Sequence, residues 1–127
     1  MRLALGLFAT LLAVPALAAA QPARVASPSQ ARAVEVQVVE KEFSITLSRL
    51  RVHSGNVIVQ LVNFGMDDHD LVVQGNAKGS KTYTFPILDP GSHSTKTFKL
   101  AAGKYTLYCS IPGHRALGMV ATLVVTR

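Results

Sequence analysis

Residues 56–64, Asn-Val-Ile-Val-Gln-Leu-Val-Asn-Phe, are the stretch that decides the fold. Their β-branched side chains disfavour a helix and favour a pleated strand. Apolar residues occupy neighbouring positions here, which is typical of a strand covered on both faces. The stretch therefore predicts a central, well-covered strand.

Segments on both sides also have the pattern of strands. Residues 34–38 and 43–47 alternate between apolar and polar side chains with a period of two, as half-buried strands do. Further segments with strand character are 71–73, 81–85, 95–100, 105–109 and 119–126. Turn-forming residues separate them at Ser54-Gly55, Gly75-Asn76, Asp89-Pro90-Gly91 and Ala102-Gly103.

No segment combines helical periodicity with helix caps, and no internal repeat is present. The pattern therefore predicts an all-β protein, an antiparallel sandwich or small barrel of about eight strands. Alternate residues of the last two strands should pack across the two sheets, namely Tyr105, Leu107, Leu123 and Val125.

The length of 127 residues fits one domain and excludes a multi-domain enzyme. Hydrophobic residues make up 49% of the chain and charged residues 16%, which excludes wholesale disorder. The formal charge of +6 would suit an acidic partner, an anionic membrane or nucleic acid. The basic residues are scattered, so the charge alone selects none of these.

The N-terminus has the pattern of an export signal. Met1-Arg2 precedes a short apolar run that is interrupted by Gly6 and Pro15 and ends in Ala18-Ala19-Ala20. A membrane-spanning anchor would need about 20 unbroken apolar residues. We therefore expect residues 1–20 to be a signal peptide, 21–33 a flexible leader, and 34–127 the folded domain of a periplasmic or otherwise exported protein.

Cys109 is the only cysteine, so it cannot form a disulfide within the chain. A free thiol in an oxidising compartment is open to oxidation and needs a reason. Three roles are open: a metal ligand, a reactive nucleophile and an inert buried side chain. The inert role is favoured by frequency alone, because free cysteines are among the most often buried residues.

The spacing around Cys109 favours a metal ligand. Cys109, His114 and Met119 follow one another at intervals of five residues. Thiolate, imidazole and thioether are all ligands soft enough for copper. A loop bent at Pro112-Gly113 can bring them to one point.

A fourth donor is expected from another part of the chain. His69 is the best candidate because it follows the loop at the end of the 56–64 strand and precedes the apolar residues 71–73. His53 and His93 lie beside turns, where solvated histidines are common.

The segment Cys109-Ser-Ile-Pro-Gly-His114 with Gly118-Met119, and Asn63-Phe-Gly65 leading to His69-Asp70-Leu71, resemble one known family. This family is the cupredoxins, or small blue copper proteins, which include plastocyanin, azurin and auracyanin. The resemblance covers most of residues 34–127. It implies a Greek-key β-sandwich that binds one copper ion, with His69, Cys109 and His114 as near-trigonal ligands and Met119 as the weak axial ligand.

The resemblance also implies roles for residues beside the ligands. The residue after the first histidine is often Asn in the best-known members, and it ties the two ligand loops together. Here it is Asp70, which can accept a hydrogen bond from Ser110 but has no side-chain N–H to donate. Pro112 has no backbone N–H, so it cannot donate to the Cys109 sulfur.

Apolar residues around His114 predict a docking surface, through which the exposed histidine edge would pass electrons to a redox partner. We assign to this surface Met66, Ile111, Arg115 and Leu117. Basic residues could steer an acidic redox partner or form an ordinary solvated face, namely Lys78, Lys81, Lys96, Lys99, Lys104 and Arg115. Nucleic acid is disfavoured because no basic patch interleaved with aromatic residues is present. We expect a monomer without membrane insertion of the mature protein.

Together these observations predict an exported single-copper (type 1) electron-transfer protein. We do not expect an enzyme, because the motif offers neither a general base nor an open position for a reacting water. The alternative is a periplasmic copper-binding buffer or delivery protein that uses the same site. A third reading is a metal-free interaction module with an inert Cys109.

Overall fold

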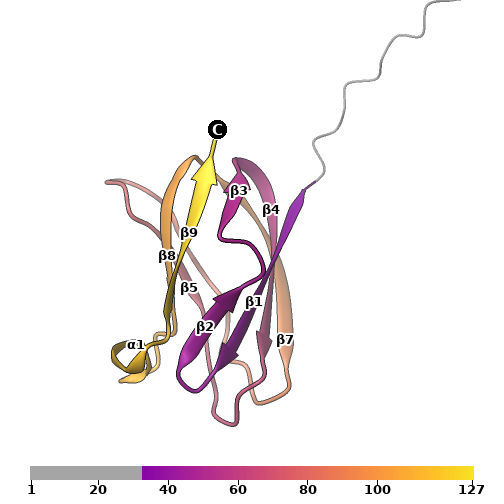
Figure 1. Cartoon of the computed structure of the whole chain (residues 1–127), viewed down its shortest axis with the longest axis vertical. Coiled ribbons are helices and arrows are strands. Elements are labelled where there is room, and N and C mark those ends of the chain that lie inside the picture. Colours follow the sequence, from indigo (N-terminus) through magenta and orange to yellow (C-terminus); the bar gives the residue numbers. More distant parts are fainter. Residues whose placement is uncertain (1–32) are drawn as a thin grey trace, which may run out of the picture. The chain divides into compact units, whose positions relative to one another are not determined.

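The structure is a computed structural model that describes residues 33–127. The predicted signal peptide (1–20) and the leader up to residue 32 lie outside the described residues. The described strands form two sheets (Figure 1). The first sheet has the order β2 (Ser44–Leu47), β1 (Val34–Lys41), β4 (Gly55–Asn63) and β7 (His93–Leu100). The second has the order β3 (Arg51–His53), β9 (Val120–Thr126), β8 (Gly103–Tyr108), β5 (Val72–Gly75) and β6 (Thr82–Thr84).

The chain passes repeatedly from one sheet to the other, which gives the predicted Greek-key β-sandwich. The prediction of purely antiparallel sheets is wrong, because β1 pairs with β4 in parallel and β3 pairs with β9 in parallel. Parallel neighbours need a crossover connection. Here the excursion through β3 in the second sheet supplies the crossover between β2 and β4.

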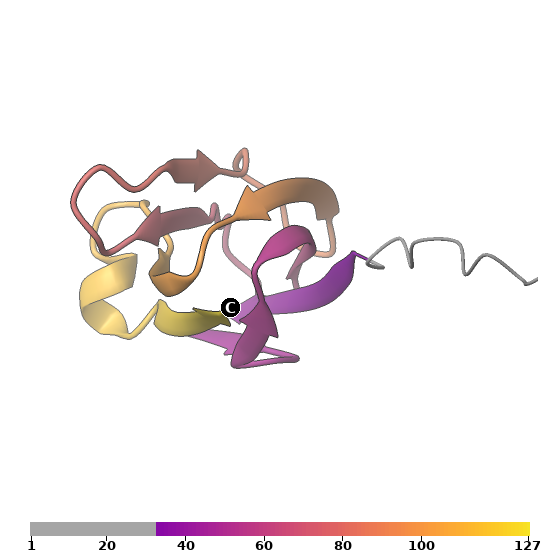
Figure 2. The same ribbon diagram turned by 90° about the horizontal axis from the view of Figure 1, so that it is seen from above.

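The strands of both sheets enclose one hydrophobic core. Figure 2 shows the ribbon of the two sheets from above. The predicted central strand lies between β1 and β7, and Val57, Val59 and Leu61 point into the core from it. Its opposite face is only partly covered, since Ile58 and Gln60 are half-buried. The four residues predicted to pack across the sheets are all buried: Tyr105, Leu107, Leu123 and Val125.

Two short elements differ from the sequence-based prediction. Strand β3 has three residues, too few to show an alternating pattern. The helix α1 (His114–Leu117) is a single turn between Gly113, with φ of +86°, and Gly118, with φ of +127°. One turn is too short to show helical periodicity. No helix in residues 33–127 has the length and apolar character needed to cross a membrane.

Candidate metal centre

Two histidines and the cysteine meet at the end of the sandwich that carries α1. His69 lies between β4 and β5 and forms an isolated bridge with Leu88. Cys109 follows the last residue of β8, and His114 is the first residue of α1. One potential ligand atom from each of the three residues lies within 4.8 Å of the others. His69 and Cys109 are fully buried, and His114 is partly exposed.

The geometry identifies which atoms face one another. His69 Nδ1 lies 3.2 Å from His114 Nδ1, and Cys109 Sγ lies 3.7 Å from the same nitrogen. The set contains two nitrogens and one sulfur, which is the donor chemistry that copper favours. A bound cation would also explain why two imidazole nitrogens and a thiol approach one another in a buried place.

Met119 closes the loop that carries Cys109 and His114. The backbone N–H of Met119 donates to the carbonyl of His114 at 3.1 Å, and that of Cys109 donates to the carbonyl of Met119 at 3.3 Å. The Met119 side chain is fully buried. The backbone therefore holds Met119 beside both residues, where the resemblance places an axial ligand.

The other two histidine candidates are not part of this cluster. Among residues 33–127, His69, Cys109 and His114 form the one close group of three such donors. His53 ends β3 and its ring contacts the hydroxyl of Thr126 at 3.1 Å. His93 begins β7 and is exposed. Both lie at strand ends beside the turns that the sequence indicated.

The protonation of Cys109 bears on the second of its three possible roles, a reactive nucleophile. Burial raises the pKa of its thiol to about 11, and the backbone N–H groups of Asp70 and Ile111 act in the opposite direction. At neutral pH this thiol is therefore protonated unless a cation replaces the proton. This environment does not suit a reactive nucleophile, which needs a low pKa.

Asp70 joins the two loops of the cluster. Its carboxylate accepts a hydrogen bond from the backbone N–H of Ser110 at 2.5 Å and a second one from the Ser110 hydroxyl. The contact expected from the sequence is present, and Asp70 is the acceptor in both bonds.

A further contributor is the β1–β2 hairpin, which the sequence analysis missed. One carboxylate oxygen of Glu42 lies 3.1 Å from His69 Nε2, and the ring of Phe43 packs edge-on against His114 with centroids 5.1 Å apart. The backbone N–H of Asp67 is the main cause that lowers the pKa of Glu42 to about 2. Glu42 is therefore ionised at neutral pH.

Asn63 is a second contributor whose side-chain role the sequence did not show. Its side-chain amide donates to the carbonyls of Asp67 and Leu88, both at 2.8 Å, and its side-chain oxygen accepts from the N–H of Gly65 at 2.8 Å. Asn63 is fully buried, so these bonds fix the loop that leads to His69. The motif Asn63-Phe-Gly65 was the available signal.

The side-chain carboxyl group of Glu40 is buried near this end of the sandwich. Neither of its carboxylate oxygens has a hydrogen-bond partner among the described residues. Burial, together with the negative charge of Asp70, raises the pKa of Glu40 to about 8. The carboxyl group is therefore protonated at neutral pH.

Several residues of the predicted docking surface lie together beside His114. Met66 is 88% exposed and shares a surface hollow of about 610 Å³ with Ile111, Pro112 and His114. The same hollow is lined by residues not predicted for this surface: Asp67, Asp68, Ile87 and Pro90. Leu117 is exposed on α1.

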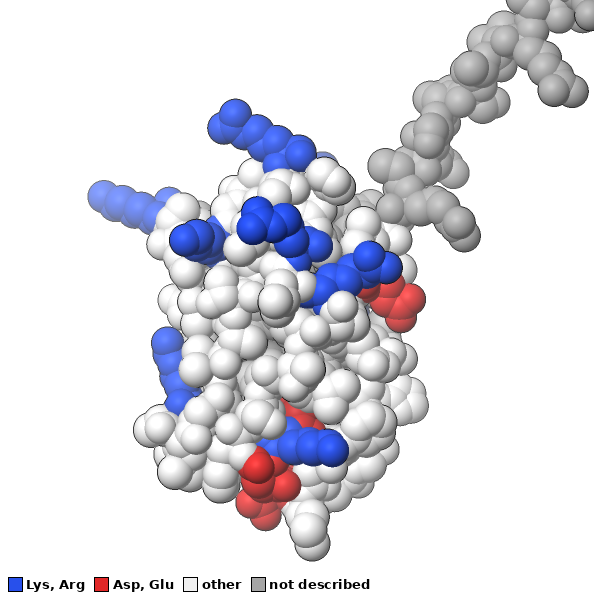
Figure 3. Space-filling view, viewed as in Figure 1, with Lys and Arg blue, Asp and Glu red and all other residues white. Residues whose placement is uncertain are grey.

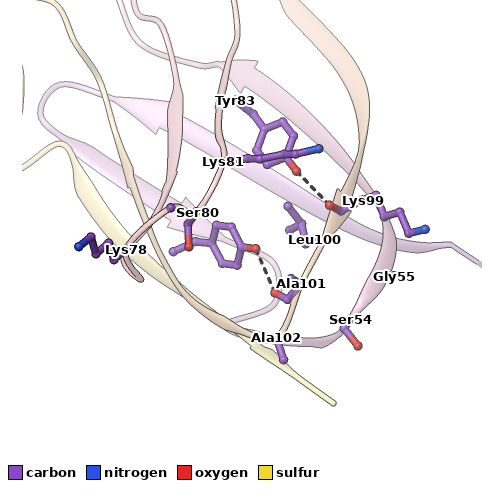
Figure 4. Close-up of a pocket in the computed structure, with 12 residues that line it drawn as sticks. Ser54, Gly55, Lys78, Ser80, Lys81, Tyr83, Lys99, Leu100, Ala101 and Ala102 are labelled. Atoms are coloured by element: carbon purple, nitrogen blue, oxygen red, sulfur yellow. Dashed lines mark hydrogen bonds between the residues drawn. The ribbon is translucent and has the colours of Figure 1, made fainter.

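The basic residues do not line this hollow. Arg115 lies near it, but its guanidinium stands over the ring of Tyr108, 4.1 Å from the centroid. Lys78, Lys81 and Lys99 line a different hollow of about 680 Å³ (Figure 4). Lys78 and Lys99 extend outward there on opposite sides. On the face seen in Figure 3, most Lys and Arg side chains gather at the end of the sandwich away from α1. No lysine among residues 33–127 lines the hollow beside His114, which favours the second of the two readings of these residues, an ordinary solvated face.

The fold and donor set define a copper-binding β-sandwich protein. The sequence profile of the copper binding proteins of the plastocyanin/azurin family matches residues 30–126. The chain belongs to this family, as the resemblance to the cupredoxins implied, and copper is its cofactor. No curated protein sequence matches the chain significantly.

Solved structures confirm the fold. Auracyanin from Roseiflexus castenholzii is 18% identical with a TM-score of 0.63, and the match covers 75% of this chain and 98% of that one. Auracyanin A from Chloroflexus aurantiacus is 22% identical with a TM-score of 0.61, covering 73% and 98%. A copper-containing nitrite reductase from Thermus scotoductus is 11% identical with a TM-score of 0.54, and only 31% of that chain is covered. At these identities the matches establish a shared fold.

Proposed function

We propose that this protein is an exported single-copper (type 1) electron carrier. His69, Cys109 and His114 would hold the ion, with Met119 as a weak axial ligand. The observation that carries the proposal is the approach of two imidazole nitrogens and one thiol to within 4.8 Å of one another. Bound copper supplies one-electron chemistry, because it is stable as both Cu(I) and Cu(II).

The protein's part in this function is to keep the donor atoms in place. The donors sit on two loops that Asp70 and Ser110 connect, and the sandwich fixes the ends of both loops. Side chains held by packing and hydrogen bonds need to move little when the charge at the site changes. Fast electron transfer requires that the ligands rearrange little. Electron transfer does not require a group that binds or transforms a substrate.

The surface around His114 supports transfer to a protein partner. His114 is partly exposed and shares its hollow with apolar residues, among them Met66 and Ile111. Asp67 and Asp68 line the same hollow. We therefore propose a redox partner with an apolar contact patch and positive charge at its rim, rather than the acidic partner that the basic residues left open. We propose that the carrier acts as a monomer.

A copper titration followed by visible spectroscopy tests the proposal. We expect Cu(II) to produce an intense thiolate-to-copper band that disappears on reduction and returns on oxidation. Cys109→Ser should abolish the band and His69→Ala should weaken or abolish it, whereas the matched control His53→Ala should leave it unchanged. A colourless complex whose copper cannot be reversibly oxidised and reduced would favour a copper buffer or delivery protein. Loss of the band in His53→Ala would contradict the ligand set.

A further inference from the structure

We propose that Glu42 is a positioning residue for the copper site: its carboxylate fixes the orientation and tautomer of His69, so that Nδ1 offers its lone pair to the ion. The inference rests on the proposed copper-ligand role of His69. It adds to the site a residue that is not a ligand and lies 27 positions from His69 in the sequence.

The contacts of Glu42 make it a fixed acceptor. Its Oε1 lies 2.6 Å from the backbone nitrogen of Met66, 2.8 Å from that of Asp67 and 3.1 Å from His69 Nε2. The first two groups can only donate, so the oxygen is an acceptor held by the loop itself. A negatively charged acceptor at this distance favours a proton on Nε2 of His69.

A proton on Nε2 leaves Nδ1 of His69 as an acceptor. That nitrogen is the one that faces His114 Nδ1 at 3.2 Å. In the metal-free protein the two facing nitrogens can share one hydrogen bond, with the proton on His114. When a cation replaces this proton, the lone pair of His69 Nδ1 already points toward the other donors.

Gly65 provides the space that this arrangement needs. A Cβ atom at residue 65 would lie 2.1 Å from Glu42 Oε1 and 2.9 Å from His69 Nε2. Any other residue would thus separate the carboxylate from the imidazole. The loop and the hairpin are therefore shaped for direct contact between Glu42 and His69.

The negative charge of Glu42 has a consequence for copper. Through the hydrogen bond it increases the electron-donating strength of His69, which favours Cu(II) over Cu(I). Removing the charge should weaken Cu(II) binding more than Cu(I) binding and thereby raise the reduction potential. Loss of such a partner typically lowers metal affinity about 10- to 100-fold.

The test compares Glu42→Gln with Glu35→Gln. Glutamine keeps the shape and the acceptor oxygen, so the hairpin contact to Met66 and Asp67 can persist without the charge. Glu35 is an exposed carboxylate near the start of β1, whereas Glu42 directly follows the end of that strand, so the two lie about 20 Å apart along the chain. The control therefore removes one charge far from the histidines.

Two measurements decide the proposal. In the metal-free protein, ¹⁵N NMR of the imidazoles should show His69 protonated on Nε2, and this tautomer should be less populated in Glu42→Gln than in Glu35→Gln. In the copper-loaded protein, Glu42→Gln should lower Cu(II) affinity about 10- to 100-fold and raise the midpoint potential well beyond the change in Glu35→Gln.

Protonation of His69 on Nδ1 in the wild-type protein would overturn the proposal. Equal potentials and Cu(II) affinities in the two variants would overturn it as well. Wild-type protein that binds no copper would refute the proposed function instead, and the NMR result would still decide whether Glu42 fixes the tautomer.

Discussion

The buried carboxyl group of Glu40 should make stability depend strongly on pH, and Glu40→Gln should remove this dependence. Burial and the charge of Asp70 raise the Glu40 pKa from 4.5 to about 8. Between these values the unfolded chain has lost the proton while the folded protein keeps it. The folded state then binds more protons, so the free energy of unfolding falls as pH rises from about 4.5 to about 8 and is level above that.

The size of the effect follows from the same two values. Each pH unit in this range removes about 1.4 kcal/mol, so the interval from 4.5 to about 8 corresponds to a loss of up to about 5 kcal/mol. Domains of this size are stable by about 5–15 kcal/mol in total. A glutamine cannot ionise and should show no such loss.

Urea denaturation followed by circular dichroism at several pH values between 4.5 and 9 measures the effect. Wild type and Glu40→Gln should both be loaded with copper and kept reduced with ascorbate, so that copper binding contributes equally to the free energy of unfolding of the two proteins. We expect the stability of Glu40→Gln relative to wild type to increase steadily from pH 4.5 to 8. Glu35→Gln, which changes an exposed carboxylate on the same strand, should follow the wild type. Parallel profiles of Glu40→Gln and wild type would refute the reasoning.

Three further changes have direct consequences. Gly65→Ala places a Cβ against Glu42 and should destabilise the protein by about 1–3 kcal/mol in thermal denaturation, with a loss of Cu(II) affinity. Leu123→Ala removes a core side chain that is 1% exposed and should cost about 2–5 kcal/mol in urea denaturation. Joint replacement of Asp67 and Asp68 by Asn should slow electron exchange with a small cationic oxidant severalfold at low salt, measured by stopped flow, because both carboxylates line the hollow beside His114.

For each of these changes, one result would contradict the prediction. Unchanged Cu(II) affinity in Gly65→Ala would show that the clash is absorbed elsewhere. A cost below 1 kcal/mol for Leu123→Ala would contradict its place in the core. For the aspartates, Lys78→Gln is the control, since Lys78 lines the hollow of Figure 4 instead. An equal effect of the control, or an effect that persists at high salt, would mean that the carboxylates do not act locally.

The sequence predicted the parts of the fold that follow from local patterns. The β-branched run at residues 56–64 indicated the central strand, and the alternation in residues 105–109 and 119–126 identified the faces that pack in the core. Strand β3 and helix α1 were missed because three or four residues do not show a period. The parallel pairing of β1 with β4 depends on a crossover between sheets, which side-chain alternation does not encode.

The same distinction applies to the site. The spacing of Cys109, His114 and Met119 within one loop was visible in the sequence, and the fold brings His69 to Cys109 and His114. Glu42 was not visible, because only tertiary folding brings the β1–β2 hairpin to His69. The positions of the lysines were not predictable either, since composition gives the net charge but not the face on which it lies.

The most direct test of the copper centre is an anomalous-scattering map at the copper absorption edge from crystals of the copper-loaded protein. We expect one strong peak bounded by His69 Nδ1, Cys109 Sγ and His114 Nδ1, with the Met119 sulfur facing it. A peak at His53 or His93 instead, or no ordered copper near the sole thiol, would contradict the proposed site.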